Sequence, residues 1–187
     1  LAWLDGVLAA AGNDLKGLTA ARSALKASGG EWRSYLDRSL GAFESDRRGD
    51  RRSAAKAMAA LEWELAERNP FFAFDPASPT PHVLLRGVDR LAAAEWLQDQ
   101  GDGAQALRLL AQPPFPPFDD KLPLAPLVFL LSARIEDGQG DTAAAHRDYQ
   151  QFLQRYDLPL PPLRHLVVEA REALARLANA QAPPTER

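Results

Sequence analysis

The sequence predicts an all-α fold, an array of antiparallel helical hairpins, and three observations support this. Alanine and leucine are abundant and form helices readily, whereas the β-branched residues that favour strands are scarce. Apolar residues recur at the three- and four-residue spacings of one helical face. A glycine followed by Asp or Asn recurs between these segments, at Gly12-Asn13, Gly49-Asp50, Gly101-Asp102 and Gly140-Asp141.

The glycine pairs predict tight turns between consecutive helices. We expect each glycine to end one helix in the left-handed conformation. The Asp after it, or Asp14 in the first turn, is expected to cap the next helix. The predicted helices lie near 1–11, 14–27, 31–47, 51–68, 82–99, 102–111, 124–137, 141–156 and 161–179. They give hairpins at about 1–27, 31–68, 82–111 and 124–156.

The last predicted helix, 161–179, is amphipathic and is expected to close the array. Pro161 and Pro162 suit its first turn, and Arg171, Glu172 and Arg176 mark a charged side. Together with the hairpins this helix predicts one repeat domain over residues 1–180. Residues 181–187 are expected to be a flexible tail.

Small residues occupy matching places in three of the predicted hairpins. One lies seven positions before the turn glycine and another five positions after it. The pairs are Ala42 with Ala54, Ala94 with Ala106, and Ala133 with Ala145. The first hairpin departs from this pattern, because Asp5 and Gly17 occupy the two places, and is therefore a degenerate repeat or a cap.

This register resembles the tetratricopeptide repeat family, whose hairpins carry small residues where their two helices cross. Tyr149 and Phe152 match its large positions on the second helix, and the resemblance covers about residues 31–160. The signature Trp and Tyr of the first helix are mostly missing, and an insertion separates the second and third hairpins. Residues 90–157 also look like the repeat arrays at the C-terminus of large bacterial signalling proteins, such as serine/threonine kinases and transcriptional activators.

The resemblance implies a right-handed superhelix that binds a protein or peptide on a concave face built from the first helix of each hairpin. The matching positions are Ser39, Phe43, Asp46, Leu91, Glu95, Gln98, Arg134 and Asp137. The alternative is a regulatory or sensory domain of a larger bacterial signalling protein that binds a small ligand. Self-association into a homo-oligomer is a third possibility.

Composition narrows the function classes further. The absence of cysteine excludes disulfides, thiolate metal sites and a cysteine nucleophile. The net charge of -3 gives no electrostatic indication of nucleic-acid binding, and no apolar run is long enough for membrane insertion. We expect no metal site, because the three histidines lie far apart in the sequence, at His82, His146 and His165. We find no phosphate-binding loop and no paired carboxylates in a predictable pocket, so we expect neither an enzyme nor a cofactor.

The N-terminus lacks an initiator Met and a signal peptide, which suggests an excised or processed fragment and a cytoplasmic protein. Two interpretations remain open for each of three further features. The basic run of Arg47, Arg48, Arg51 and Arg52 could bind an acid or phosphate, or be a solvated turn. Phe71, Phe72 and Phe74 could form an exposed interface, or fill a gap between the second and third hairpins. The segment 113–118 could be a polyproline ligand, or a stiff connector.

Overall fold

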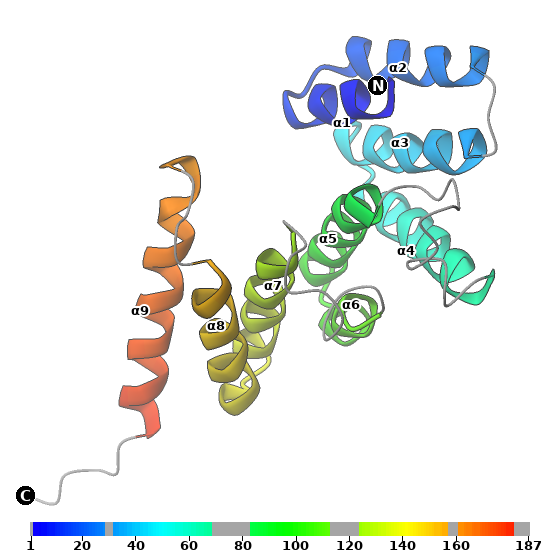
Figure 1. Cartoon of the computed structure of the whole chain (residues 1–187). Coiled ribbons are helices and arrows are strands. Elements are labelled where there is room, and N and C mark those ends of the chain that lie inside the picture. Colours follow the sequence, from blue (N-terminus) through cyan, green and yellow to red (C-terminus); the bar gives the residue numbers. More distant parts are fainter. Residues whose placement is uncertain (1, 29–31, 69–82, 113–123, 157–160, 182–187) are drawn as a thin grey trace, which may run out of the picture. The chain divides into compact units, whose positions relative to one another are not determined.

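The computed structural model describes residues 2–28, 32–68, 83–112, 124–156 and 161–181, and every regular element in these ranges is a helix. The all-α prediction is therefore confirmed for this part of the chain. Contacts divide the chain into two compact units, Leu1–Pro114 and Phe115–Arg187, called unit 1 and unit 2 below. Figure 1 labels α1 to α6 in unit 1 and α7 to α9 in unit 2.

Unit 1 consists of three helical hairpins that follow one another along the chain. Each pairs two helices: α1 (Ala2–Ala11) with α2 (Leu15–Ala27), α3 (Arg33–Arg47) with α4 (Arg51–Arg68), and α5 (Val83–Asp99) with α6 (Gly103–Leu110). Consecutive hairpins also pack together, through α2 on α3 and α4 on α5, while α1 reaches α3 as well. This is the neighbour-on-neighbour packing of a helical array.

Unit 2 is one hairpin with a closing helix. Helix α7 (Ala125–Gly138) pairs with α8 (Thr142–Arg155), and α9 (Arg164–Gln181) packs on α8 after a short 3₁₀ turn, η1 (Pro161–Leu163). Figure 1 shows these three helices side by side. Their shared core is apolar and includes Leu130, Tyr149, Phe152, Val167 and Leu177. The predicted final helix is therefore present and packs on the last hairpin.

The four hairpin turns share one hydrogen-bonding pattern. At the second turn, Gly49 N–H donates to the Asp46 carbonyl and Asp50 N–H donates to the Ser45 carbonyl, both at 2.9 Å. This is a Schellman motif, and its central residue needs a positive φ, which is 88° at Gly49. The Asp50 side chain then accepts a 3.0 Å hydrogen bond from Ser53 N–H and so caps α4. The same pattern recurs with Gly101 and Asp102, and with Gly140 and Asp141.

The first turn differs from the prediction by one residue. Asn13, and not Gly12, takes the left-handed conformation, with φ of 57°. Asparagine tolerates this region because its short polar side chain can form local hydrogen bonds. Asn13 N–H donates to the Ala10 carbonyl at 3.0 Å, and Asp14 accepts from Gly17 N–H at 2.9 Å, as predicted for the cap.

This shift corrects the register of the first hairpin. Counted from Asn13, the small residue before the turn is Gly6, not Asp5, and the residue after it is Leu18, not Gly17. Gly6 is buried, and a Cβ placed there would lie 2.6 Å from Leu40 Cδ1 and 3.2 Å from Ala21 Cβ. A larger residue at this position would therefore require the buried Leu40 side chain to shift. The three alanine pairs predicted for the other hairpins are all buried.

Candidate functional site

The eight positions predicted for the concave face have different surroundings in the structure. Those on α3 are buried: Ser39, Phe43 and Asp46. On α5, Glu95 is exposed while Leu91 and Gln98 are half-buried, and Arg134 and Asp137 on α7 are half-buried. Contact of any of them with a partner stays a prediction, but Glu95 and Gln98 are the polar members that the structure leaves accessible in unit 1.

The three buried α3 residues make contacts within unit 1. Ser39 accepts a hydrogen bond from Trp3 of α1 and donates one to Asp89 of α5. Phe43 packs edge to face on Trp96, with ring centroids 5.5 Å apart. Asp46 accepts hydrogen bonds from Arg47 and, at 2.7 Å, from Arg51.

The two α7 residues pair with the closing helix of unit 2. Arg134 donates two 2.6 Å hydrogen bonds to Glu169, and Arg176 donates two to Asp137, at 2.5 and 3.2 Å. The hydrogen bonds from the two arginines hold the pKa values of Glu169 and Asp137 below their ordinary range. Helix α9 therefore engages both side chains that the sequence assigned to a partner surface on α7.

Unit 1 contains a group of polar side chains in its interior, which we call the buried polar cluster. It consists of Tyr35, Ser39, Glu62, Asp89 and Arg90, which come from α3, α4 and α5. Trp3 Nε1 of α1 donates to Ser39 Oγ at 2.9 Å, and the Arg90 guanidinium donates to Glu62 Oε2 at 3.2 and 3.3 Å. Arg90 also donates to the backbone carbonyl of Gln112. The cluster thus connects four helices of the three hairpins.

Tyr35 lies between the two carboxyl groups of the cluster. Its hydroxyl donates to Asp89 Oδ2 at 2.7 Å and also lies 3.1 Å from Glu62 Oε1. Ser39 Oγ donates to Asp89 Oδ1 at 2.8 Å, whereas Arg90 and Arg86 lie 3.2 and 3.5 Å from Glu62 Oε2. Asp89 is therefore held by two hydroxyl groups, and Glu62 is paired with two cations.

Burial shifts the pKa values of this cluster. Desolvation raises the pKa of Asp89 to about 7, with the Glu62 charge acting in the same direction. Burial likewise lowers the pKa of Arg90 to about 10 and raises that of Tyr35 well above its ordinary value. A carboxyl group that titrates near neutral pH could serve as an acid or base. Asp89 and Glu62 have no exposed surface, however, so no substrate reaches them in this conformation.

Sequence reasoning named Glu62 only as one of many carboxylates and did not single out Asp89 or Arg90. A signal was present on α5. Arg86, Asp89 and Arg90 fall at the i, i+3 and i+4 spacing that continues through the buried Ala93 and Leu97. Charged residues on the buried stripe of a helix require partners in the interior.

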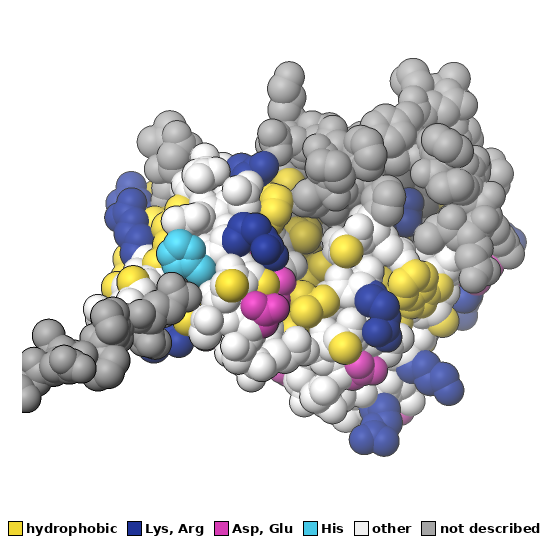
Figure 2. Space-filling model, turned by 90° about the horizontal axis from the view of Figure 1, so that it is seen from below, with side chains coloured by type: hydrophobic (Ala, Val, Ile, Leu, Met, Phe, Trp, Pro, Cys, Tyr) yellow, Lys and Arg dark blue, Asp and Glu magenta, His cyan; other side chains and the backbone are white. Residues whose placement is uncertain are grey.

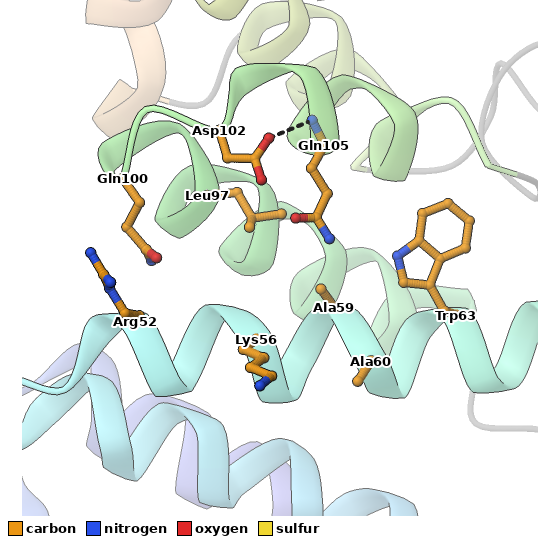
Figure 3. Close-up of a pocket in the computed structure, with 9 residues that line it drawn as sticks. All are labelled: Arg52, Lys56, Ala59, Ala60, Trp63, Leu97, Gln100, Asp102 and Gln105. Carbon is orange, nitrogen blue, oxygen red and sulfur yellow. Dashed lines mark hydrogen bonds between the residues drawn. The ribbon is translucent and has the colours of Figure 1, made fainter.

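The described residues of unit 1 form an open groove between α4 and the α5–α6 hairpin, which we call the α4–α6 groove. It holds about 490 Å³. Helix α4 contributes one wall, and the opposite wall comes from the end of α5 and the start of α6 (Figure 3). The lining residues are Arg52, Lys56, Ala59, Ala60, Trp63, Leu97, Gln100, Asp102 and Gln105.

Arg52 lines this groove, whereas the other three arginines of the predicted basic run do not. Arg47 pairs with Asp46, Arg48 pairs with Glu44, and Arg51 pairs with Asp46 and Asp99. Arg52 and Lys56 line the groove and form no ion pair with the described residues. Most of the basic run is thus neutralised within unit 1, and Arg52 is the member that remains for a ligand.

Other sequence-based expectations fall partly or wholly outside the described residues. Phe71, Phe72, Phe74, His82 and the segment 113–118 lie there, so both interpretations of the aromatic and proline-rich segments remain open. The described residues bring no three His, Asp or Glu side chains together as metal ligands. On the face drawn in Figure 2, basic side chains are spread out, with acidic and hydrophobic ones between them.

None of the helices described is both long and apolar enough to cross a membrane. Comparison with models of known families, with curated proteins and with solved structures found no match in any of the three. The candidate site is therefore identified from the geometry of unit 1 alone, and not from a relative.

Proposed function

We propose that the chain is a protein-interaction module of the tetratricopeptide type, which binds a segment of a partner protein in the α4–α6 groove. The repeat assignment is supported by the shared turn pattern and by the small residues at the helix crossings. With further hairpins in the same register, such units form a right-handed superhelix. A binding role, rather than catalysis, is supported by the burial of the ionisable cluster and by the open groove.

The observation that carries the proposal is the chemistry of the groove. Its floor is apolar, with Ala59 and Leu97, and Trp63 stands at one end (Figure 3). Its lining also includes two cations and two amides, from Arg52, Lys56, Gln100 and Gln105. Peptide-binding grooves combine an apolar surface with a few polar groups in this way. An open groove suits an extended segment, whereas a small ligand would be expected in an enclosed pocket.

The test is selection of peptides from a random display library on the intact chain, followed by calorimetric titration of synthetic copies. Ala60→Phe fills the groove, while Ala57→Phe is its matched control, because Ala57 is an exposed alanine of α4 outside the lining. We expect Ala60→Phe to weaken peptide binding at least tenfold, which corresponds to a loss of about 1.4 kcal/mol of binding free energy. Ala57→Phe should leave the affinity unchanged.

Three results would contradict the proposal. A selection that enriches no peptide would remove the binding function. Equal binding by Ala60→Phe and Ala57→Phe would move the site away from the groove. Loss of binding in Glu95→Ala/Gln98→Ala, with Ala60→Phe unaffected, would place the site on the first-helix positions predicted from the resemblance.

A further inference from the structure

The two cations of the α4–α6 groove lack the acidic partners that their neighbours have. Arg47, Arg48 and Arg51 are all paired with carboxylates of unit 1. Arg52 and Lys56 are exposed, form no ion pair with the described residues, and lie one helical turn apart on the groove wall. The only acidic residue in the described lining is Asp102, whose carboxylate caps α6 by accepting from Gln105 N–H at 3.1 Å. Two cations against one carboxylate leave the groove with an excess of one positive charge.

This local charge is opposite in sign to that of the whole chain, which is -3. General electrostatic attraction would therefore favour a basic ligand, and only contacts inside the groove would favour an acidic one. A guanidinium can bind a carboxylate with two parallel hydrogen bonds, and a lysine adds a point charge beside it.

The spacing along α4 fixes the length of the segment that can use both ends of the groove. Arg52, Lys56, Ala59 and Trp63 follow at intervals of four, three and four residues, so they share one face of α4 (Figure 3). With a rise of about 1.5 Å per residue, Arg52 and Trp63 are roughly 16 Å apart along the helix. An extended peptide covers this distance with about five residues.

Trp63 offers the apolar end of this path. Its side chain is half-buried, and its indole stands at the end of the groove opposite Arg52 (Figure 3). Aromatic rings of this kind contribute most when a large apolar side chain packs on them. Between the two ends, the side-chain amide of Gln105 has no hydrogen bond to the described residues and can pair with a peptide backbone.

We infer that the partner segment is acidic at one end, with a carboxylate held by Arg52 and Lys56 and a large apolar side chain about five residues away that packs on Trp63. This inference rests on the proposed function, since it specifies the ligand of the same groove.

The experiment compares three fluorescein-labelled peptides of about seven residues, in which Phe is last and the first two positions are Glu, Gln or Lys. Fluorescence polarisation measures their affinity for the intact chain at low and at high salt. We expect the Glu peptide to bind at least tenfold more tightly than the Gln peptide, with an advantage that shrinks as salt screens the charges. The Lys peptide is expected to bind most weakly.

The variant Arg52→Gln/Lys56→Gln should abolish the preference for Glu over Gln, while thermal unfolding confirms that it folds. Its matched control is Arg108→Gln, which removes an exposed cation of α6 outside the groove lining. This control should retain the full preference. Trp63→Ala should weaken the Glu and Gln peptides by the same factor, because the ring acts on the apolar end that both share.

The outcomes separate this inference from the proposed function. If the Glu and Gln peptides bind equally and Ala60→Phe weakens both, the acidic preference is wrong and the groove remains a binding site. If none of the three peptides binds while library-derived peptides do, the spacing and the acidic end are both wrong. If a short single-stranded oligonucleotide binds more tightly than the Glu peptide and Arg52→Gln/Lys56→Gln removes it, the cations recognise phosphate instead.

Discussion

Units 1 and 2 both pack helical hairpins, but they place their charged side chains differently. In unit 1, Glu62, Asp89 and Arg90 lie in the interior with no exposed surface. In unit 2, the main core is apolar, and the Arg134–Glu169 pair lies near the surface with side chains 37% and 41% exposed.

The comparison shows that similar hairpins can depend on different interactions. Removing one partner of a buried ion pair leaves an uncompensated charge in a medium of low polarity, which is strongly destabilising. Removing one partner of a surface pair leaves a charge that water solvates. We therefore expect the stability of unit 1 to depend more strongly on its charged side chains, and on their protonation, than the stability of unit 2 does.

The largest effect is expected when an arginine is removed from the buried polar cluster. Arg90→Met leaves the fully buried Glu62 with only the more distant Arg86 as a cation. The free energy of unfolding should fall by about 3–5 kcal/mol. Urea denaturation measures this, and Arg134→Met in unit 2 is the comparison, with an expected loss of about 0–1 kcal/mol. Similar losses for the two variants would show that the distinction between the units is wrong.

The next effect is a dependence of stability on pH that Asp89 causes. The folded state raises the pKa of Asp89 from 3.8 to about 7, so it binds this proton more tightly than the unfolded chain does. The free energy of unfolding should therefore fall as pH rises from about 4 to about 7, by at most about 4 kcal/mol from this group. Above that range the contribution of Asp89 is constant.

Asp89→Asn isolates the contribution, because an amide has nearly the shape of the carboxyl group and does not titrate. The pH profile of this variant should be flatter than that of the original protein, and its advantage should be greatest above pH 7. The difference between the profiles is the useful quantity, since Glu136 of unit 2 also has its pKa raised to about 7 by partial burial and by Asp148. Parallel profiles would contradict the raised pKa of Asp89.

A smaller effect is expected at the turn glycines, because hairpins in both units have the same type of turn. Gly101→Ala forces a side chain into the left-handed region, where φ is 83°, although nothing lies within 4 Å of the added Cβ. We expect a loss of about 1–2 kcal/mol from backbone strain alone. Gly138→Ala is the matched control, because it adds a methyl group into open space in a helix and should be neutral or slightly stabilising. Equal effects at both sites would mean that the positive φ is not required.

The smallest effect concerns the surface pair of unit 2. A double-mutant cycle of Arg134→Met and Glu169→Gln should give a coupling energy of about 0.2–1 kcal/mol, since both side chains are more than a third exposed. Added salt should reduce it further. A coupling above about 2 kcal/mol would show that α9 is held on the hairpin mainly by this pair rather than by the apolar core.

The sequence was sufficient to predict the helices and their turns because both are local. Capping aspartates act within a few residues, and a glycine such as Gly49 marks its turn by itself. The first turn was the exception in register. Gly12 was expected to take the left-handed conformation, but Asn13 takes it, because asparagine also tolerates this region.

The interior and the groove were not predictable in the same way, because they depend on contacts between distant segments. Asp89 meets Tyr35 and Ser39 only after the second and third hairpins pack together. The groove needs the separation between α4 and α6, which spacing in the sequence does not give. Burial of Ser39 and Phe43 likewise follows from the approach of α5 to α3, and not from their positions on one helix face.

Hydrogen exchange of the intact chain, with and without the Glu peptide, tests most directly whether binding takes place in the α4–α6 groove. We expect protection along α4 between Arg52 and Trp63 and at the start of α6 around Gln105. We expect none in α7 or α9, where Arg134 and Asp137 are already paired. Protection that appears on α7 and α9, or on α5 around Glu95 without α4, would contradict the groove and favour the first-helix positions.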